Sequence, residues 1–152
     1  PPPGPAVATE RCMWRNRVLK GEVHDENCAA MGGQTGHAGL FGTVAGVLDF
    51  AQGVLTGSFS PMMLEAIRTP QYSHRTCGWE RKFAGWSGGQ ACSDETIGHT
   101  GFTGTGLWID FGRGIAWTLL TNRVHPTRHF DSGIFVLRPA TGDAVINAWE
   151  AP

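Results

Sequence analysis

The sequence is poor in lysine, tyrosine and charge of either sign. Lys20 and Lys82 are the only lysines, and Tyr72 is the only tyrosine among 152 residues. Charged residues make up 16% of the chain, and the formal net charge is -1. This balance creates no strong electrostatic field, so it argues against nucleic acid or anionic lipid as a partner and favours a neutral or small one.

Local patterns of metal, redox and membrane proteins are also missing. The four cysteines form no C-x-x-C pair, so neither a zinc ribbon nor a dithiol motif is present, and we expect no metal or cofactor. Free thiols in a reducing compartment are favoured, with one or two disulfides as the alternative. No apolar run approaches about 18 residues, which predicts no membrane span. The first residues carry no export signal, so the compartment stays open, with the cytoplasm slightly favoured by the cysteines.

Length and the proline-rich start predict one domain behind a short arm. A chain of 152 residues has the length of a single domain. Residues 1–10, PPPGPAVATE, have the composition of an arm or linker, so we expect residues 11–152 to form the domain. Residues 10–19 fit either a short helix or an extended arm. The glycine-rich stretch 21–42 predicts a compact irregular loop.

Three segments carry helix signals. Apolar residues recur at helical spacing over residues 44–55, and Thr43 stands where an N-cap is expected. Serine followed by proline predicts the start of a second, short helix over residues 60–68. Pro139 at a first helical position predicts a terminal helix over residues 139–149, which could cover one face of a sheet.

Strand signals dominate the carboxyl-terminal third. Residues 105–110 and 115–122 are strand-like runs joined by a hairpin connection, and residues 98–102 precede them. We therefore predict an α+β fold, with an antiparallel sheet of about three or more strands and helices packed on it. Residues 85–95, GWSGGQACSDE, are expected to be an exposed loop.

Ser87 satisfies the G-x-S-x-G pattern of a nucleophile elbow. That elbow requires a buried strand before the serine and a helix directly after it. The sequence that follows, GQACSDETIG, has two glycines and no apolar period, so the helix is not predicted. A flexible loop is the better interpretation of Ser87.

The histidines give no local metal-binding pattern. His125 and His129 have an i,i+4 spacing, but Pro126 between them disfavours a regular helix through both. The segment His24-Asp25-Glu26-Asn27 predicts a turn held by hydrogen bonds between side chains and backbone.

The tripeptide His99-Thr100-Gly101 is the strongest candidate for a binding site. Glycine weakens a strand unless something approaches the backbone closely, so Gly101 indicates either a ligand or a bulge. A ligand's acyl group lying there would accept a hydrogen bond from the Phe102 N–H. Thr100 offers a hydroxyl, and His99 a titratable proton carrier.

Two long blocks of sequence, residues 21–55 and 97–126, resemble one family. GEVHDENCAAMGGQTGHAGLFGTVAGVLDFAQGVL and IGHTGFTGTGLWIDFGRGIAWTLLTNRVHP are similar to the carboxyl-terminal half of serine β-lactamases and penicillin-binding-protein-like hydrolases, in their esterase-like branch. The resemblance implies a truncated β-lactamase-like fold. It also implies that His99-Thr100-Gly101 matches the family's K-T-G or H-T-G triad, that His99 and Thr100 contact the substrate, and that the Phe102 N–H is half of an oxyanion hole.

Two further motifs of that family are missing from these residues. Its nucleophile lies in S-x-x-K, where the lysine helps to deprotonate the serine, and a Y-x-N element transfers a further proton. No serine here is followed three positions later by lysine, and Tyr72 is followed two positions later by His74. We therefore expect no complete catalytic set in this chain.

The resemblance leaves three functional hypotheses open. The chain is a remnant of a serine hydrolase with little or no activity of its own, a half-enzyme completed by a partner chain, or a module that binds a small acyl ligand without chemistry. By analogy, the missing half would cover the edge of the strand at residues 115–122, so we expect a second copy, a partner chain or a rearranged arm at that edge.

Overall fold

A four-stranded antiparallel sheet forms the centre of the protein. The computed structural model describes residues 4–151, so the first residues of the expected arm at 1–10 lie outside the described residues. The strand order is β3-β4-β5-β6, and neighbouring strands are antiparallel. The strands are β3 (Glu80–Arg81), β4 (Thr96–Thr100), β5 (Thr105–Asp110) and β6 (Ile115–Leu120). The predicted α+β fold with an antiparallel sheet is confirmed.

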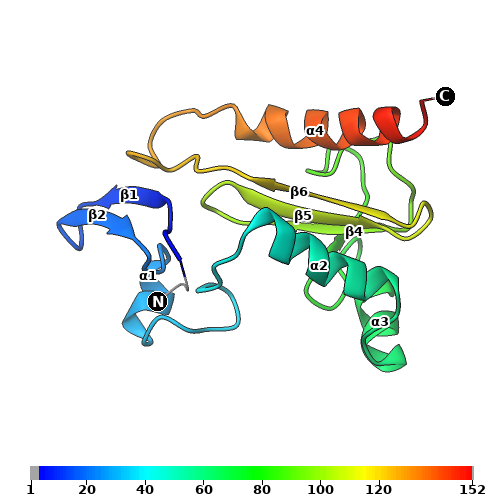
Figure 1. The fold of residues 1–152 in the computed structure, drawn as a ribbon, viewed down its shortest axis with the longest axis horizontal. Helices are drawn as coiled ribbons and strands as arrows, with labels where there is room; N and C mark the ends of the chain where they lie inside the picture. The colour runs from blue at the N-terminus through cyan, green and yellow to red at the C-terminus, as the bar shows by residue number, and fades with distance from the viewer. Residues whose placement is uncertain (1–3, 152) are drawn as a thin grey trace.

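A smaller unit precedes the sheet and lies beside it (Figure 1). It consists of a hairpin, β1 (Ala8–Cys12) and β2 (Arg17–Lys20), and a short helix, α1 (Glu26–Ala30). The segment that sequence left open between helix and extended arm is therefore a β-hairpin. Arg15 in its turn donates to the Val23 carbonyl at 2.6 Å, which ties the hairpin to the segment before α1.

Helices α2 (Val44–Leu55) and α3 (Pro61–Arg68) begin where the sequence predicts. Thr43 Oγ1 accepts a hydrogen bond from Gly46 N–H at 3.1 Å, and Ser60 Oγ accepts one from Met63 N–H at 3.3 Å. These side chains satisfy donors that a helix start leaves free. Both helices lie on the same side of the sheet in Figure 1.

The terminal helix is longer than predicted. Helix α4 runs over Ile134–Trp149, so Pro139 lies inside it rather than at its first position. Gly133 at the N-cap has a φ of 69° and offers no side-chain cap, which explains why sequence gave no start signal there. Helix α4 covers the face of the sheet opposite α2 (Figure 1).

Two hydrophobic clusters fill the space between the sheet and these helices. The cluster under α2 and α3 consists of Ala51, Val54, Ile67, Ile97 and Ile109. The cluster under α4 consists of Trp86, Cys92, Trp108, Trp117 and Ile146. The sheet is therefore buried on both faces, which gives three layers.

The loop at residues 85–95 was expected to be exposed, but it is partly buried. Trp86 and Cys92 are buried in the cluster under α4. Asp143 of α4 accepts hydrogen bonds from Gln90 N–H at 2.6 Å and Ala91 N–H at 2.8 Å. Helix α4 therefore holds the loop against the sheet. The Trp86 and Cys92 side chains of the loop are part of the hydrophobic core.

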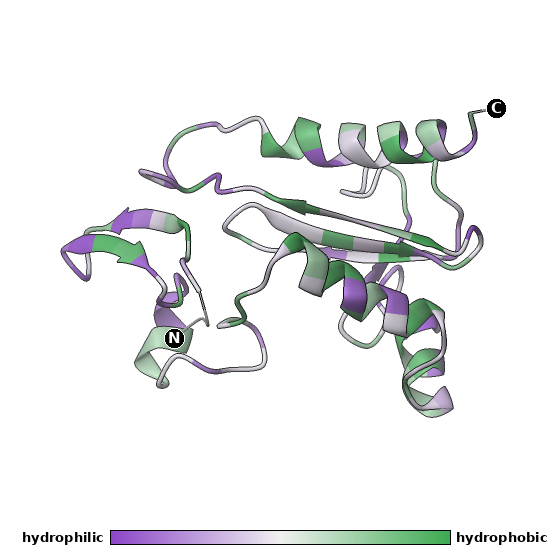
Figure 2. Cartoon of the chain, viewed as in Figure 1, coloured by the Kyte–Doolittle hydropathy of each residue, from purple (hydrophilic) through white to green (hydrophobic). Residues whose placement is uncertain are grey.

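The outer edge of β6 has no strand beside it within residues 4–151, because β1 and β2 form a sheet of their own. The first turn of α4 also carries exposed apolar side chains: Phe135 is 78% exposed and Val136 is 74% exposed. Figure 2 shows this turn as a hydrophobic segment of α4.

Candidate functional site

The predicted residues lie where β4 ends and turns towards β5. Strand β3 pairs with β4 only at Gly98 and Ile97, so His99 and Thr100 have no neighbour on that side among the described residues. His99 is exposed, and its Nδ1 donates to the Thr100 carbonyl at 2.9 Å. In the neutral ring this leaves Nε2 as an acceptor that faces no protein donor in the described part of the chain.

The connection from β4 to β5 is a tight turn over residues 101–104. Gly101 N–H donates to the Thr105 carbonyl at 2.9 Å, and Gly104 N–H donates to the Gly101 carbonyl at 3.1 Å. Phe102 and Thr103 stand between them, and within residues 4–151 neither N–H donates to an acceptor. The turn therefore presents two backbone donors that a ligand could use, and that of Phe102 is the one which the sequence singled out.

Gly101 leaves room for the Thr105 side chain. A Cβ at this position would lie 2.2 Å from Thr105 Oγ1, whereas the nearest backbone atom, Thr105 N, would be 4.0 Å away. The Thr105 side chain thus fills the space beside Gly101, and this packing accounts for the glycine without a ligand.

Arg138 of α4 binds both ends of the turn. Its Nη2 donates to the Gly101 carbonyl and to the Thr105 carbonyl, each at 2.7 Å. The side chain is only 5% exposed. Burial lowers the pKa of this guanidinium, and nearby Arg123 lowers it further. A buried arginine therefore fixes the carbonyl on each side of the turn.

The Phe102 ring lies among three polar side chains although it is 57% exposed. The His24 ring stacks on it with centroids 5.8 Å apart, and the Cζ atoms of Arg123 and Arg128 lie 4.5 Å and 5.5 Å from its centroid. Arg123 Nε also donates to the Phe102 carbonyl at 2.7 Å. Cations over an aromatic face are attracted by its quadrupole, so these contacts hold the ring in place.

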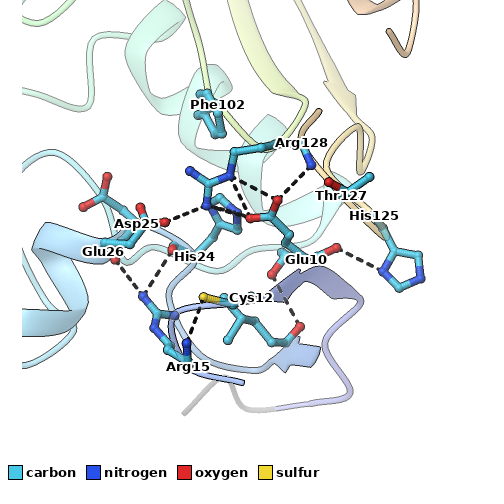
Figure 3. A network of polar contacts seen from close by, with 12 residues as sticks. Glu10, Cys12, Arg15, His24, Asp25, Glu26, Phe102, His125, Thr127 and Arg128 are labelled. Carbon is cyan, nitrogen blue, oxygen red and sulfur yellow. Dashed lines mark hydrogen bonds and ion pairs between the residues drawn. The ribbon is translucent and has the colours of Figure 1, made fainter. Parts of the chain in front are cut away.

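Glu10, His24, Glu26 and Arg128 form a network that we call the Arg128 cluster (Figure 3). Arg128 Nη2 donates to Glu10 Oε2 and to Glu26 Oε1, each at 2.6 Å. His24 Nε2 donates to Glu10 Oε2 at 2.8 Å. The Arg128 backbone N–H also donates to Glu10 Oε1 at 2.8 Å. The cluster thus joins β1 and α1 to the segment that follows β6.

The Glu10 carboxylate is charged at neutral pH although it is buried. Burial alone raises its pKa, but the hydrogen bonds from Arg128 and His24 outweigh this and lower the pKa from 4.5 to about 2. The Glu10 partner in turn raises the pKa of Arg128. Both members of the pair therefore stay ionised, as a buried pair requires.

The other candidates from the sequence have structural roles. Ser87 Oγ accepts a hydrogen bond from Trp108 Nε1 at 3.3 Å, and no helix follows it directly. His125 Nδ1 donates to the Thr9 carbonyl at 3.0 Å. Asp25 caps α1 by accepting from Cys28 N–H at 2.7 Å, as the predicted turn requires. Within residues 4–151, no three metal-binding side chains gather at one point.

Sequence reasoning missed Arg123, Arg128 and Arg138, which surround the turn. None stands in a recognisable motif, and each acts on a residue at least 21 positions away. A signal was available only for Arg138, which stands inside the apolar run IFVLRPA. A charged side chain in such a run is expected to be buried and therefore to need a polar partner.

Comparison with known proteins assigns the family. A model described as Beta-lactamase matches residues 1–140, so the chain belongs to the beta-lactamase family. The structure is also similar to a beta-lactamase from Mycobacterium bovis, with a TM-score of 0.63, 24% identity, and coverage of 75% of this chain and 47% of that one. The truncated β-lactamase-like fold implied by the sequence is confirmed.

The curated relatives include proteins named as an amidase and as putative carboxypeptidases. The chain is 36% identical over 124 residues to the N-acetylmuramyl-L-alanine amidase of Bacillus subtilis (strain 168), covering 73% of this chain and 28% of that protein. It is 32% identical over 124 residues to a putative D-alanyl-D-alanine carboxypeptidase of Escherichia coli (strain K12), covering 73% and 29%. The chain therefore spans less than a third of the length of these relatives. Among the described residues, no helix has the length and apolar character to cross a membrane.

The lowered pKa of Glu10 predicts an acid-sensitive stability. A carboxyl whose folded pKa of about 2 lies below its ordinary 4.5 stabilises the fold fully above pH 4.5, by about 3 kcal/mol, and this contribution is lost as pH falls towards 2. We expect Glu10→Gln to lower the free energy of unfolding most at pH 7, and the difference from wild type to narrow below pH 4.5. Urea unfolding followed by tryptophan fluorescence at several pH values measures it.

Glu22→Gln is the matched control for that experiment. Glu22 also accepts from an arginine, Arg17, at 2.7 Å, but this pair is exposed. Exposed pairs contribute about 0–1 kcal/mol, so we expect little change at any pH. Equal effects of the two substitutions would contradict the assignment of the acid sensitivity to Glu10.

Proposed function

We propose that the end of β4 forms the substrate-contacting wall of a serine hydrolase site, in the esterase-like branch of the family. The observation that carries this is the Phe102 N–H, which has no acceptor within residues 4–151 and follows directly after His99-Thr100-Gly101. A backbone N–H with a defined direction can stabilise the negative charge that develops on an acyl oxygen. The names of the relatives, an amidase and a carboxypeptidase, favour an acyl substrate such as an amide, peptide or ester.

Each residue of the wall has a proposed role. Phe102 N–H donates to the acyl oxygen of the ligand. The half-buried Thr100 offers its hydroxyl to the same ligand, and exposed His99 can accept or return a proton through Nε2. Gly101 has no side chain that would stand between the ligand and the backbone of the wall.

We further propose that these 152 residues bind an acyl ligand without turning it over. None of the six serines is followed three positions later by lysine, so the nucleophile and its activating base are not supplied. A complementary chain carrying S-x-x-K would complete the site, which is the half-enzyme alternative. A module that binds a small molecule without any chemistry is the other alternative.

Incubation with benzylpenicillin and with p-nitrophenyl acetate tests this proposal. We expect intact-mass measurement to show no acylated protein, while a titration followed by amide NMR shifts the resonances of Thr100 and Phe102. Thr100→Val removes the hydroxyl at nearly constant shape and should weaken binding about three- to tenfold, the effect of one lost hydrogen bond.

Thr141→Val is the control, because the Thr141 hydroxyl bonds only within its own helix, to the Leu137 carbonyl at 2.8 Å. Acylation of the isolated chain would contradict the absence of a nucleophile, and Ser87 would be the first residue to substitute. Perturbation confined to residues distant from β4 would contradict the proposed wall. Turnover that appears only after addition of a chain with S-x-x-K would favour the half-enzyme.

The second proposal concerns the open edge of β6. Within residues 4–151 no strand lies beside β6, and the hairpin that could have covered it pairs only with itself. Free N–H and C=O groups along a strand edge form a template for pairing with another segment. We propose that a second copy or a complementary chain occupies this edge.

Sedimentation equilibrium over a range of protein concentrations tests the edge. We expect a concentration-dependent dimer, and slower hydrogen exchange of β6 amides as the dimer forms. A strict monomer whose outer β6 amides exchange freely at every concentration would contradict the proposal.

A further inference from the structure

The amides of Phe102 and Thr103 make no hydrogen bond within the turn, unlike those of Gly101 and Gly104. Gly101 and Gly104 are held by hydrogen bonds within the turn, and Arg138 binds the Gly101 carbonyl. Phe102 lies between them with its N–H unbonded in the described part of the chain. The direction of that N–H therefore depends on contacts made by the Phe102 carbonyl and ring.

Two of the contacts on the Phe102 ring come from the Arg128 cluster. The His24 ring stacks on it at an interplanar angle of 24°, and Arg128 Cζ lies 5.5 Å from its centroid (Figure 3). The remaining cation, Arg123, contacts both the ring and the Phe102 carbonyl but has no carboxylate partner among the described residues. Arg128 and His24 are thus the contacts whose own positions are fixed by a carboxylate.

Both of these side chains donate hydrogen bonds to the same carboxylate, that of Glu10. Arg128 donates from Nε to Glu10 Oε2 at 2.9 Å and from Nη2 to the same oxygen at 2.6 Å, and His24 donates to it at 2.8 Å. Glu26 binds Arg128 from a second direction at 2.6 Å. Since a guanidinium is planar and is held by two carboxylates here, its face has one favoured orientation towards Phe102.

We propose that Arg128 is a positioning residue for the Phe102 amide, acting through the Phe102 ring. The unit formed by β1, β2 and α1 then sets the direction of the donor in the wall described above. The binding role of that donor rests on the proposed function, whereas the positioning itself does not. Arg128 touches no ligand in this scheme and acts through the ring, while its Nε and Nη2 donate to Glu10 and Glu26.

The test compares Arg128→Lys with Arg113→Lys. Arg113 is a matched control, because it also bridges two carboxylates, Asp110 at 3.2 Å and Glu150 at 2.6 Å, but does not contact the turn at 101–104. Lysine keeps the charge and loses the planar fork. We expect only Arg128→Lys to shift the amide resonances of Phe102 and Thr103 and to speed their exchange with solvent.

Benzylpenicillin supplies the second readout. We expect its dissociation constant to rise about fivefold in Arg128→Lys, a typical size for coupling through intervening side chains, and to stay unchanged in Arg113→Lys. The indole resonances of Trp86, Trp108 and Trp117 report whether each variant is folded, because all three are buried in one cluster.

Phe102→Leu keeps the proposal testable if Arg128→Lys does not fold. It removes the ring that Arg128 contacts while leaving the ion pairs of the Arg128 cluster in place, and the same changes at the Thr103 amide are expected. Unchanged turn resonances in a folded Arg128→Lys or Phe102→Leu variant would overturn the positioning role. Shifted turn resonances with no penicillin binding in any variant would support positioning and contradict the proposed function.

Discussion

The ion pair between buried Glu10 and partly buried Arg128 is the interaction on which the arrangement of the two units depends. Glu10 is 4% exposed, and its carboxylate accepts hydrogen bonds from the side chain and the backbone of Arg128. A charge taken out of water is costly unless a partner of opposite charge and further hydrogen bonds compensate for it. Removing Arg128 would therefore leave the buried Glu10 carboxylate without its main partner, and removing Glu10 would leave Arg128 with Glu26 alone. This mutual requirement holds β1 against the segment after β6.

The same pair connects the small unit to the turn between β4 and β5. On one side the turn is held by Arg138 of α4, which donates to the Gly101 and Thr105 carbonyls. On the other side Phe102 is contacted by Arg128 and His24. The turn thus receives contacts from both ends of the chain. The site that we propose at this turn needs a rigid frame, because a donor displaced by about 1 Å would lose much of its effect on an acyl oxygen.

Much of the fold could be predicted from local signals. Helix α2 follows from Thr43 and an apolar period, and β5 and β6 follow from two strand-like runs around a hairpin connection. Interactions over long sequence distances could not be predicted, since Glu10 and Arg128 are 118 positions apart and neither stands in a motif. The burial of Trp86 could not be predicted, because the glycines around it indicate an exposed loop. The start of α4 could not be predicted, because Gly133 at its N-cap has no capping side chain. The tripeptide His99-Thr100-Gly101 was singled out by a glycine in a strand, and the family resemblance implied its role, which stays a prediction.

A double-mutant cycle on Glu10 and Arg128 measures the central interaction most directly. Glu10→Gln, Arg128→Met and the double variant are unfolded in urea at pH 7, and the coupling energy follows from the four free energies of unfolding. For a buried pair in which each partner compensates the other's charge, we predict a coupling of at least about 1.5 kcal/mol, with the double variant more stable than the sum of the single effects implies. Additive effects, within about 0.5 kcal/mol, would contradict the claim that this pair holds the two units together.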